Sequence, residues 1–81
     1  MHQIVCKIGA VWDASAKVWT ATSVDVPGLA TEADTLEDLT QKLRVIVPEL
    51  LQLNHVIPID QASTVAIELT SHRQEWVEIA A

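Results

Sequence analysis

The feature that most constrains this chain is a run of apolar residues with helical spacing between residues 36 and 53. Alternating steps of three and four place these residues on one face of a helix; they are Leu36, Leu39, Leu43, Ile46, Leu50 and Leu53. Thr35 stands before the run as a helix N-cap, with Asp38 at the third helical position. The pattern predicts one long amphipathic helix over residues 36–53, which must cover an apolar surface elsewhere in the fold.

Pro48 and Asn54 determine how this helix continues and where it ends. Pro48 cannot donate a backbone hydrogen bond to the carbonyl of Arg44, and its ring crowds that carbonyl. Val47 is a poor N-cap for a second helix, so the sequence favours one helix bent at Pro48 over two separate helices. Asn54 tolerates the left-handed backbone conformation that is common after the last helical turn, and we expect the helix to stop at Asn54 and His55.

Two segments before the helix have the composition of β-strands. Residues 4–12 are rich in isoleucine and valine, and residues 18–23 combine β-branched residues with Trp19. The polar segment 13–17 between them has the length of a hairpin connection. A lone hairpin is marginally stable in water, so the two strands need further strands or the helix beside them.

A turn and a short strand then lead into the helix. Pro27 fixes its own φ angle and Gly28 can adopt a positive φ, so residues 25–29 favour a type II turn. Residues 29–33 follow as a short third strand.

After the helix, residues 63–69 alternate between apolar and polar side chains, as expected for a half-buried strand. Residues 75–79 either continue this strand or form a separate edge strand. The sequence thus predicts an α+β fold with the order β-β-β-α-β, in which one long helix packs on one face of an antiparallel sheet of three to four strands.

The length and charge of the chain limit its function. The 81 residues show no compositional break and predict a single domain over residues 1–81, with no separate DNA-binding domain. The net charge is −6, and the five basic residues are scattered, which argues against direct binding of nucleic acid. No signal peptide and no apolar run that could span a membrane is recognisable, so we expect a cytoplasmic protein.

The side chains that carry chemistry form no catalytic pattern. The carboxylates fall mostly at turns or at the helix start, where capping and the helix dipole explain them; these are Asp13, Asp25, Glu32, Asp34, Glu37 and Asp38. His2, His55 and His72 lack the spacing of metal ligands. Cys6 is the single cysteine and is expected to be a buried thiol. We therefore expect no enzyme, no metal, no cofactor and no small-molecule substrate.

The three tryptophans are the only aromatic residues of the chain. We expect at least one of Trp12 and Trp19 in the core, because no phenylalanine or tyrosine is available to fill it. Trp76, near the end of the chain and beside Glu75, is the better candidate for an interface.

The turn and the helix start together resemble the HicB-like antitoxin family, and in particular its short, single-domain, uncharacterised branch. The resemblance covers about residues 2–70 and rests on Trp19, on the turn Asp25, Pro27, Gly28 and Leu29, on the helix start Thr35 and Leu36, and on the run from Pro48 to Asn54. It implies a β-β-β-α-β domain related to a partial ribonuclease-H fold that lacks the active site and is commonly dimeric. Full antitoxins of this type mask a small basic RNA-cleaving toxin and carry a C-terminal DNA-binding unit, for which residues 69–81 leave no room.

Two hypotheses on function follow. The first is a small acidic protein-binding module of the antitoxin type, which would bind and mask a basic toxin. The second is a structural or oligomerisation domain, a homodimer without a toxin partner that associates through its last strand or through Trp76.

Overall fold

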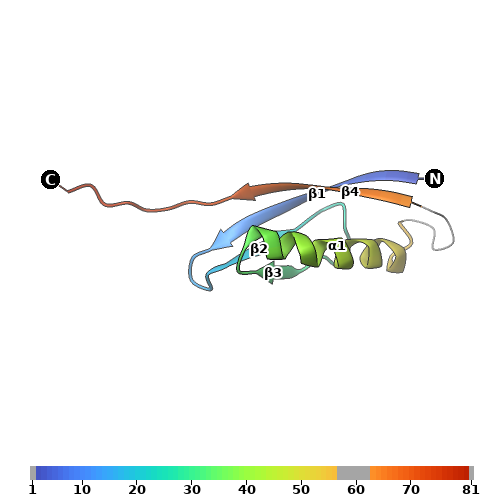
Figure 1. Cartoon of the computed structure of the whole chain (residues 1–81), viewed down its shortest axis with the longest axis horizontal. Helices are drawn as coiled ribbons and strands as arrows, with labels where there is room; N and C mark the ends of the chain where they lie inside the picture. The colour runs from blue at the N-terminus through green and yellow to red at the C-terminus, as the bar shows by residue number, and fades with distance from the viewer. Residues whose placement is uncertain (1, 57–62, 81) are drawn as a thin grey trace.

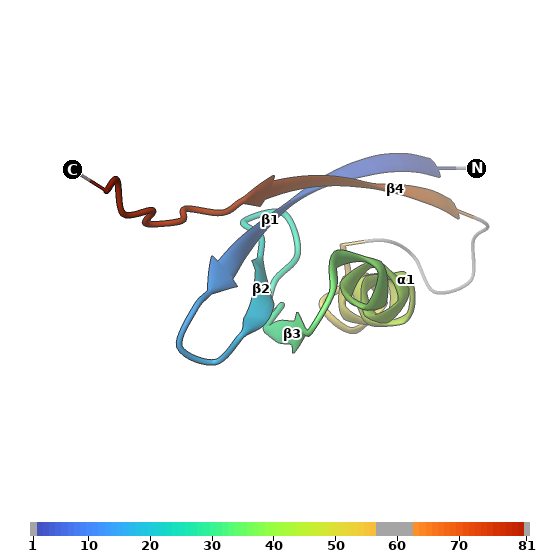
Figure 2. The ribbon, with the colours of Figure 1, turned by 60° about the vertical axis from the view of Figure 1, so that its left-hand side comes forward.

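The computed structural model describes residues 2–56 and 63–80. These residues form four strands and one helix, namely β1 (His2–Asp13), β2 (Val18–Thr22), β3 (Thr31–Ala33), α1 (Leu36–Leu53) and β4 (Ser63–His72). The strands make one sheet in the order β3-β2-β1-β4, and α1 lies against one face of it (Figure 1). Figure 2 looks nearly along α1 and shows the same two layers. The predicted α+β class and the order β-β-β-α-β are confirmed.

The direction of β4 differs from the prediction of an antiparallel sheet. β1 pairs antiparallel with β2, and β2 with β3, but β4 pairs parallel with β1 from His2↔Ser63 to Val11↔His72. The sheet is therefore mixed. The reason lies in α1: it follows β3 and carries the chain back to the end of the sheet where β3 begins, so that the next strand must run in the same direction as β3 and β1.

The core lies between α1 and the sheet face that it covers. Its buried members from β1 and β2 are Cys6, Ile8, Ala10, Trp19 and Ala21, and those from α1 are Leu39, Leu43, Val47 and Leu51. No buried residue among those described is polar or charged. Complete burial of a leucine or isoleucine side chain stabilises the fold by about 1.5–3 kcal/mol, so this layer holds α1 on the sheet.

The buried face of α1 departs from the predicted stripe. Leu39 and Leu43 are fully buried as expected, but the stripe continues through Val47 and Leu51, while the predicted Leu53 is 73% exposed. The observed steps are all of four residues. A row with that spacing is inclined to the helix axis, which suits a helix that crosses twisted strands.

Both ends of α1 are capped by side chains. The hydroxyl of Thr35 accepts a hydrogen bond from the Asp38 amide at 3.0 Å, as predicted. Pro48 lies inside a single helix, also as predicted. At the far end, Asn54 is the C-cap with φ −95°, and its Nδ2 donates to the Leu50 carbonyl at 2.9 Å. The left-handed residue is His55, with φ 58°, so the expected conformation occurs one residue later than Asn54.

Candidate functional site

The predicted turn at residues 25–29 forms as expected and is joined to the end of α1 by a hydrogen bond. The Leu29 amide donates to the Val26 carbonyl at 3.2 Å, and Gly28 has φ 81°, which together define a type II turn. Asn54 at the end of α1 donates to the Pro27 carbonyl at 3.3 Å. The turn thus fixes the end of the helix relative to the sheet.

Asp25 and Ser23 replace a missing stretch of strand beside β1. β2 ends at Thr22, which pairs with Gly9. Two residues before Gly9, the backbone of Lys7 faces the same side of β1 but has no β2 residue opposite it. The Lys7 amide donates to Asp25 Oδ2 at 2.8 Å, while the Ser23 hydroxyl donates to the Lys7 carbonyl at 2.6 Å. The two side chains therefore satisfy the backbone groups that β2 would otherwise pair.

The residues that carry the family resemblance are thus structural in this chain. Asp25 pairs with β1, Pro27 and Gly28 shape the turn, Leu29 is almost fully buried, and Thr35 caps the helix. Leu36 packs against the core at the first turn of α1.

The described histidine, cysteine and acidic side chains do not come together in a common site. Among the described residues, no group of three or more histidine, cysteine or acidic side chains could hold a metal ion. Cys6 is fully buried, and this burial, followed by the negative charge of Asp25, raises the pKa of its thiol above the ordinary value of 9.0. His55 and His72 are exposed, and the side chain of His2 lies outside the described part. No described helix is long and apolar enough to cross a membrane.

The prediction that at least one of Trp12 and Trp19 lies in the core is confirmed. Trp19 is buried, and its ring lies 5.4 Å from that of Trp12, with an angle of 59° between the ring planes. The guanidinium carbon of Arg73 stands 4.2 Å from the centre of the Trp12 ring. Trp76, in contrast, is 90% exposed. The role of Trp76 in an interface stays a prediction.

A shallow groove runs between α1 and β4. It has a volume of about 410 Å³ and is lined by Thr40, Arg44, Val65, Ile67 and Leu69. The three apolar residues point toward the helix layer but are only half-buried, because α1 covers β1 and β2 more fully than β4. Arg44 makes no ion pair with any other described residue. The groove therefore offers an apolar floor with a cation at its rim whose charge no described carboxylate neutralises.

The strand beside this groove continues into an exposed tail, which we define as residues 73–80. β4 is the last strand of the described sheet, and the tail extends beyond it and away from the body of the protein (Figure 1). No backbone hydrogen bond joins the tail to other described residues. It nevertheless carries Trp76, Val77 and Ile79, which are 90%, 81% and 94% exposed. Residues 75–79 form neither a continuation of β4 nor a separate paired strand in this chain.

Sequence reasoning identified Trp76 but missed the groove. Val65, Ile67 and Leu69 carry the alternation of a half-buried strand, and that signal was visible. The contributions of Thr40 and Arg44 depend on where α1 lies across the sheet, which periodicity does not determine.

A family described as a domain of unknown function (DUF1902) matches residues 5–79. The chain belongs to this family. Among solved structures, the chain is similar to a hypothetical protein, TTHA1013, from the extremely thermophilic bacterium Thermus thermophilus, with 45% sequence identity and a TM-score of 0.70. The similarity covers 90% of this chain and 99% of the other. No curated protein matches the chain. The DUF1902 match includes most of the tail as well as β4.

Proposed function

We propose that this DUF1902 protein is a non-enzymatic protein-binding module that recognises an extended segment by strand addition along β4. The observation that carries the proposal is the combination of a ten-residue strand at the end of the sheet with an apolar tail that leaves the body of the protein. An edge strand presents backbone donors and acceptors to another chain, and pockets beside it select side chains.

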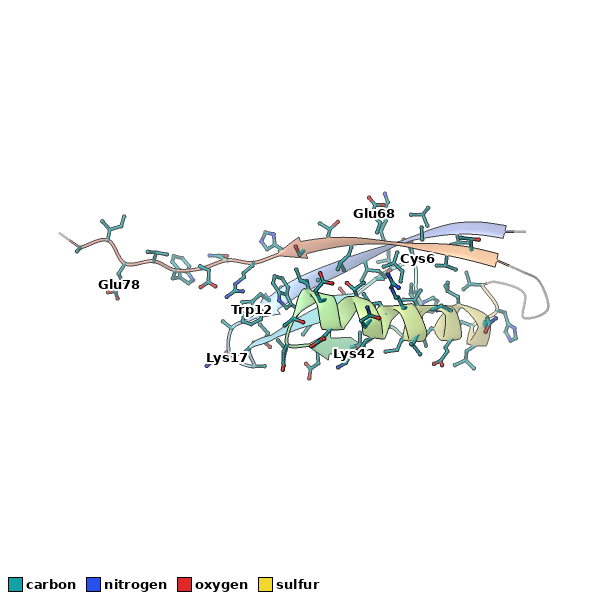
Figure 3. All side chains as sticks on the ribbon, viewed as in Figure 1. Cys6, Trp12, Lys17, Lys42, Glu68 and Glu78 are labelled. Carbon is teal, nitrogen blue, oxygen red and sulfur yellow. The ribbon has the colours of Figure 1, made fainter. Side chains whose placement is uncertain are left out.

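The groove supplies the selectivity that strand addition alone lacks. A segment laid along β4 would place alternate side chains over Val65, Ile67 and Leu69, next to Arg44. Apolar side chains followed by a carboxylate fit this surface. The opposite face of β4 is less selective, because its side chains are exposed and mixed in character, as with Ala66 and Glu68. Figure 3 shows Glu68 pointing away from α1.

The proposal is tested by affinity capture with the full-length chain from cells that make it. Arg44 and Trp76 are exposed and lie outside the core, so Arg44→Glu and Trp76→Ala leave the fold intact. We expect partner proteins to be retained by the unaltered chain and lost with either variant. Val24, which is 99% exposed and lies in neither the groove nor the tail, gives the matched control Val24→Ala. An identical set of retained proteins for all four baits would contradict the proposal.

A second candidate, the masking of a small basic toxin, is favoured by an acidic hollow at the start of α1. The hollow has a volume of about 430 Å³, and its lining includes Glu32, Asp34 and Asp38. Lys42, its single cation, donates to the Glu32 backbone carbonyl at 2.6 Å. The net charge of −6 and the resemblance to HicB-like antitoxins support the same role. We also propose the cytoplasm as the compartment, on the ground of the single free thiol of Cys6.

Co-expression with the short basic proteins encoded next to this chain tests the second candidate. We expect one of them to co-purify and its toxicity to be relieved by the chain, with relief lost on Asp34→Lys and Asp38→Lys. The antitoxin role would be excluded if none of these neighbouring basic proteins slowed growth and none formed a complex with the chain.

A further inference from the structure

We infer that the tail is a proteolytic cleavage site of the folded protein, cut between Trp76 and Val77 by an endoprotease whose primary pocket accepts a large apolar side chain. The inference goes beyond the proposed function, because it needs no partner bound along β4. Hydrolysis adds one water molecule across the peptide bond. The carbonyl carbon of Trp76 becomes a carboxylate, and the amide nitrogen of Val77 becomes an amino group. No oxidant, reductant or other co-reactant enters this step.

The backbone of the tail is ready to enter a protease. Endoproteases bind the chain that they cut as an extended strand, over several residues on each side of the bond. A folded segment has to open before it fits, and its cleavage is slowed because the open form is rare. No backbone hydrogen bond joins residues 73–80 to other described residues, and the tail runs out from the body in an extended path (Figure 1). The tail therefore fits an extended binding site without any prior opening.

The other parts of the described chain are held by hydrogen bonds. The strands and α1 are held by their own backbone pairing. In the connection between β1 and β2, Asp13 Oδ1 accepts from the amides of Ser15 and Ala16. In the connection between β2 and β3, the turn at residues 25–29 is closed by its own hydrogen bond and joined to the end of α1. Among the described segments of comparable length, only the tail can lie in a protease without breaking such bonds.

The exposed apolar side chains select the bond that is cut. A hydrophobic primary pocket, as in chymotrypsin, takes large apolar side chains, and Trp76 is 90% exposed. Leu53 is also 73% exposed, but it ends α1. The three amides that follow it donate to carbonyls of α1, at 3.0 Å from Asn54, 3.1 Å from His55 and 2.8 Å from Val56. Two exposed apolar side chains thus differ in the freedom of their backbone, and we expect the cut at Trp76 to come first.

Arg73 marks the point where the accessible part of the tail begins. Its guanidinium carbon lies 4.2 Å from the centre of the Trp12 ring, and its Nε pairs with Glu75 Oε1 at 2.6 Å. The end of β4 lies directly before it and is paired with β1. A protease specific for basic residues, such as trypsin, would have to withdraw Arg73 from Trp12 and detach the end of β4 from β1. The cut after Trp76 leaves both contacts in place.

Cleavage changes the surface of the protein and not its core. Trp76, Val77 and Ile79 are exposed and contribute nothing to the buried layer between α1 and the sheet. The cut releases the segment that begins at Val77, and with it two of these three apolar side chains. The new carboxylate then places a negative charge beside the remaining Trp76 ring. Proteolysis can therefore remove apolar surface from the tail while the rest of the protein stays folded.

The test is limited proteolysis of the full-length chain by chymotrypsin and by trypsin, followed over time by mass spectrometry. A synthetic peptide of residues 70–80 is the reference, because it contains both bonds without the body of the protein. We expect chymotrypsin to cut the chain first after Trp76, at a rate within about tenfold of that for the peptide. We expect trypsin to cut after Arg73 more than about tenfold more slowly in the chain than in the peptide. Trp76→Ala should abolish the early chymotrypsin cut, and the control Leu53→Ala should leave its rate unchanged.

Three results would overturn the inference. One is a first chymotrypsin cut after Leu53 or inside a strand. The second is a Trp76 bond that is cut more than about tenfold more slowly in the chain than in the peptide. The third is a trypsin cut after Arg73 that is as fast in the chain as in the peptide, because the end of β4 would then be open as well. None of these results decides the proposed function, which is judged separately by the proteins that the chain captures.

Discussion

Replacing Asp25 tests the conclusion that the turn at residues 25–29 has a structural role. Its Oδ2 accepts from the Lys7 amide at 2.8 Å, and no other described residue offers that amide an acceptor. Hydrogen bonds to a charged group contribute about 1.5–3 kcal/mol to stability when they are sheltered. Asp25 is exposed, and water can replace part of this bond. We therefore expect Asp25→Ala to lower the free energy of unfolding by about 1–1.5 kcal/mol.

The assay is urea and thermal unfolding at one fixed protein concentration, followed by circular dichroism and the fluorescence of Trp19. For a domain of this size, the expected loss corresponds to a fall in Tm of about 5–10 °C. Asp25→Asn keeps an acceptor oxygen without the charge and should show a smaller loss. Asp34 is also exposed but makes no hydrogen bond with any described residue, so Asp34→Ala is the matched control. Equal stability of Asp25→Ala and Asp34→Ala would refute the structural role of Asp25.

Three further predictions concern the cap, the core and the buried thiol. Thr35→Ala should cost about 1 kcal/mol in unfolding experiments, and Thr35→Ser should recover most of it, because the serine hydroxyl can still accept from the Asp38 amide. Leu43→Ala should destabilise the fold by about 2–5 kcal/mol, whereas Leu53→Ala should change it by less than about 0.5 kcal/mol; equal losses would contradict the observed burial of α1. Because burial raises the pKa of the Cys6 thiol, the folded protein binds this proton more tightly than the unfolded chain does. The resulting stability is present below pH 9.0, the ordinary pKa of the thiol in the unfolded chain, and is lost as the pH rises through the higher pKa of the folded protein. Over this pH range the free energy of unfolding should therefore fall more steeply for the unaltered chain than for Cys6→Ala.

The elements that sequence predicts well here are those fixed by local interactions. The bounds of α1 follow from its periodic leucines and from the Thr35 cap, both of which act within a few residues. The turn at Pro27 and Gly28 is similarly local, because it depends on the φ angles that these two residues can adopt. The burial of Trp19 and Cys6 follows from the alternation of their strands and the scarcity of aromatic residues.

The features that the sequence did not predict depend on how distant elements meet. Alternation along β4 is the same for a parallel and an antiparallel neighbour, so it could not reveal the pairing with β1. The choice of Leu51 over Leu53 as a buried residue depends on the angle at which α1 crosses the sheet. The groove beside Arg44 likewise arises because α1 stops short of covering β4. Each of these properties is set by the packing of two layers and not by any single segment.

The most direct test of strand addition is amide hydrogen exchange of the full-length chain, measured with and without its bound partner or, for self-association, at high and low concentration. The tail amides have no backbone acceptor among the described residues of their own copy and should exchange rapidly when the protein is unbound. If an extended segment adds along β4, as the account predicts, the β4 amides that face away from β1 gain protection in the complex. A complex that forms while β4 exchanges as fast as in the free chain would contradict binding by strand addition.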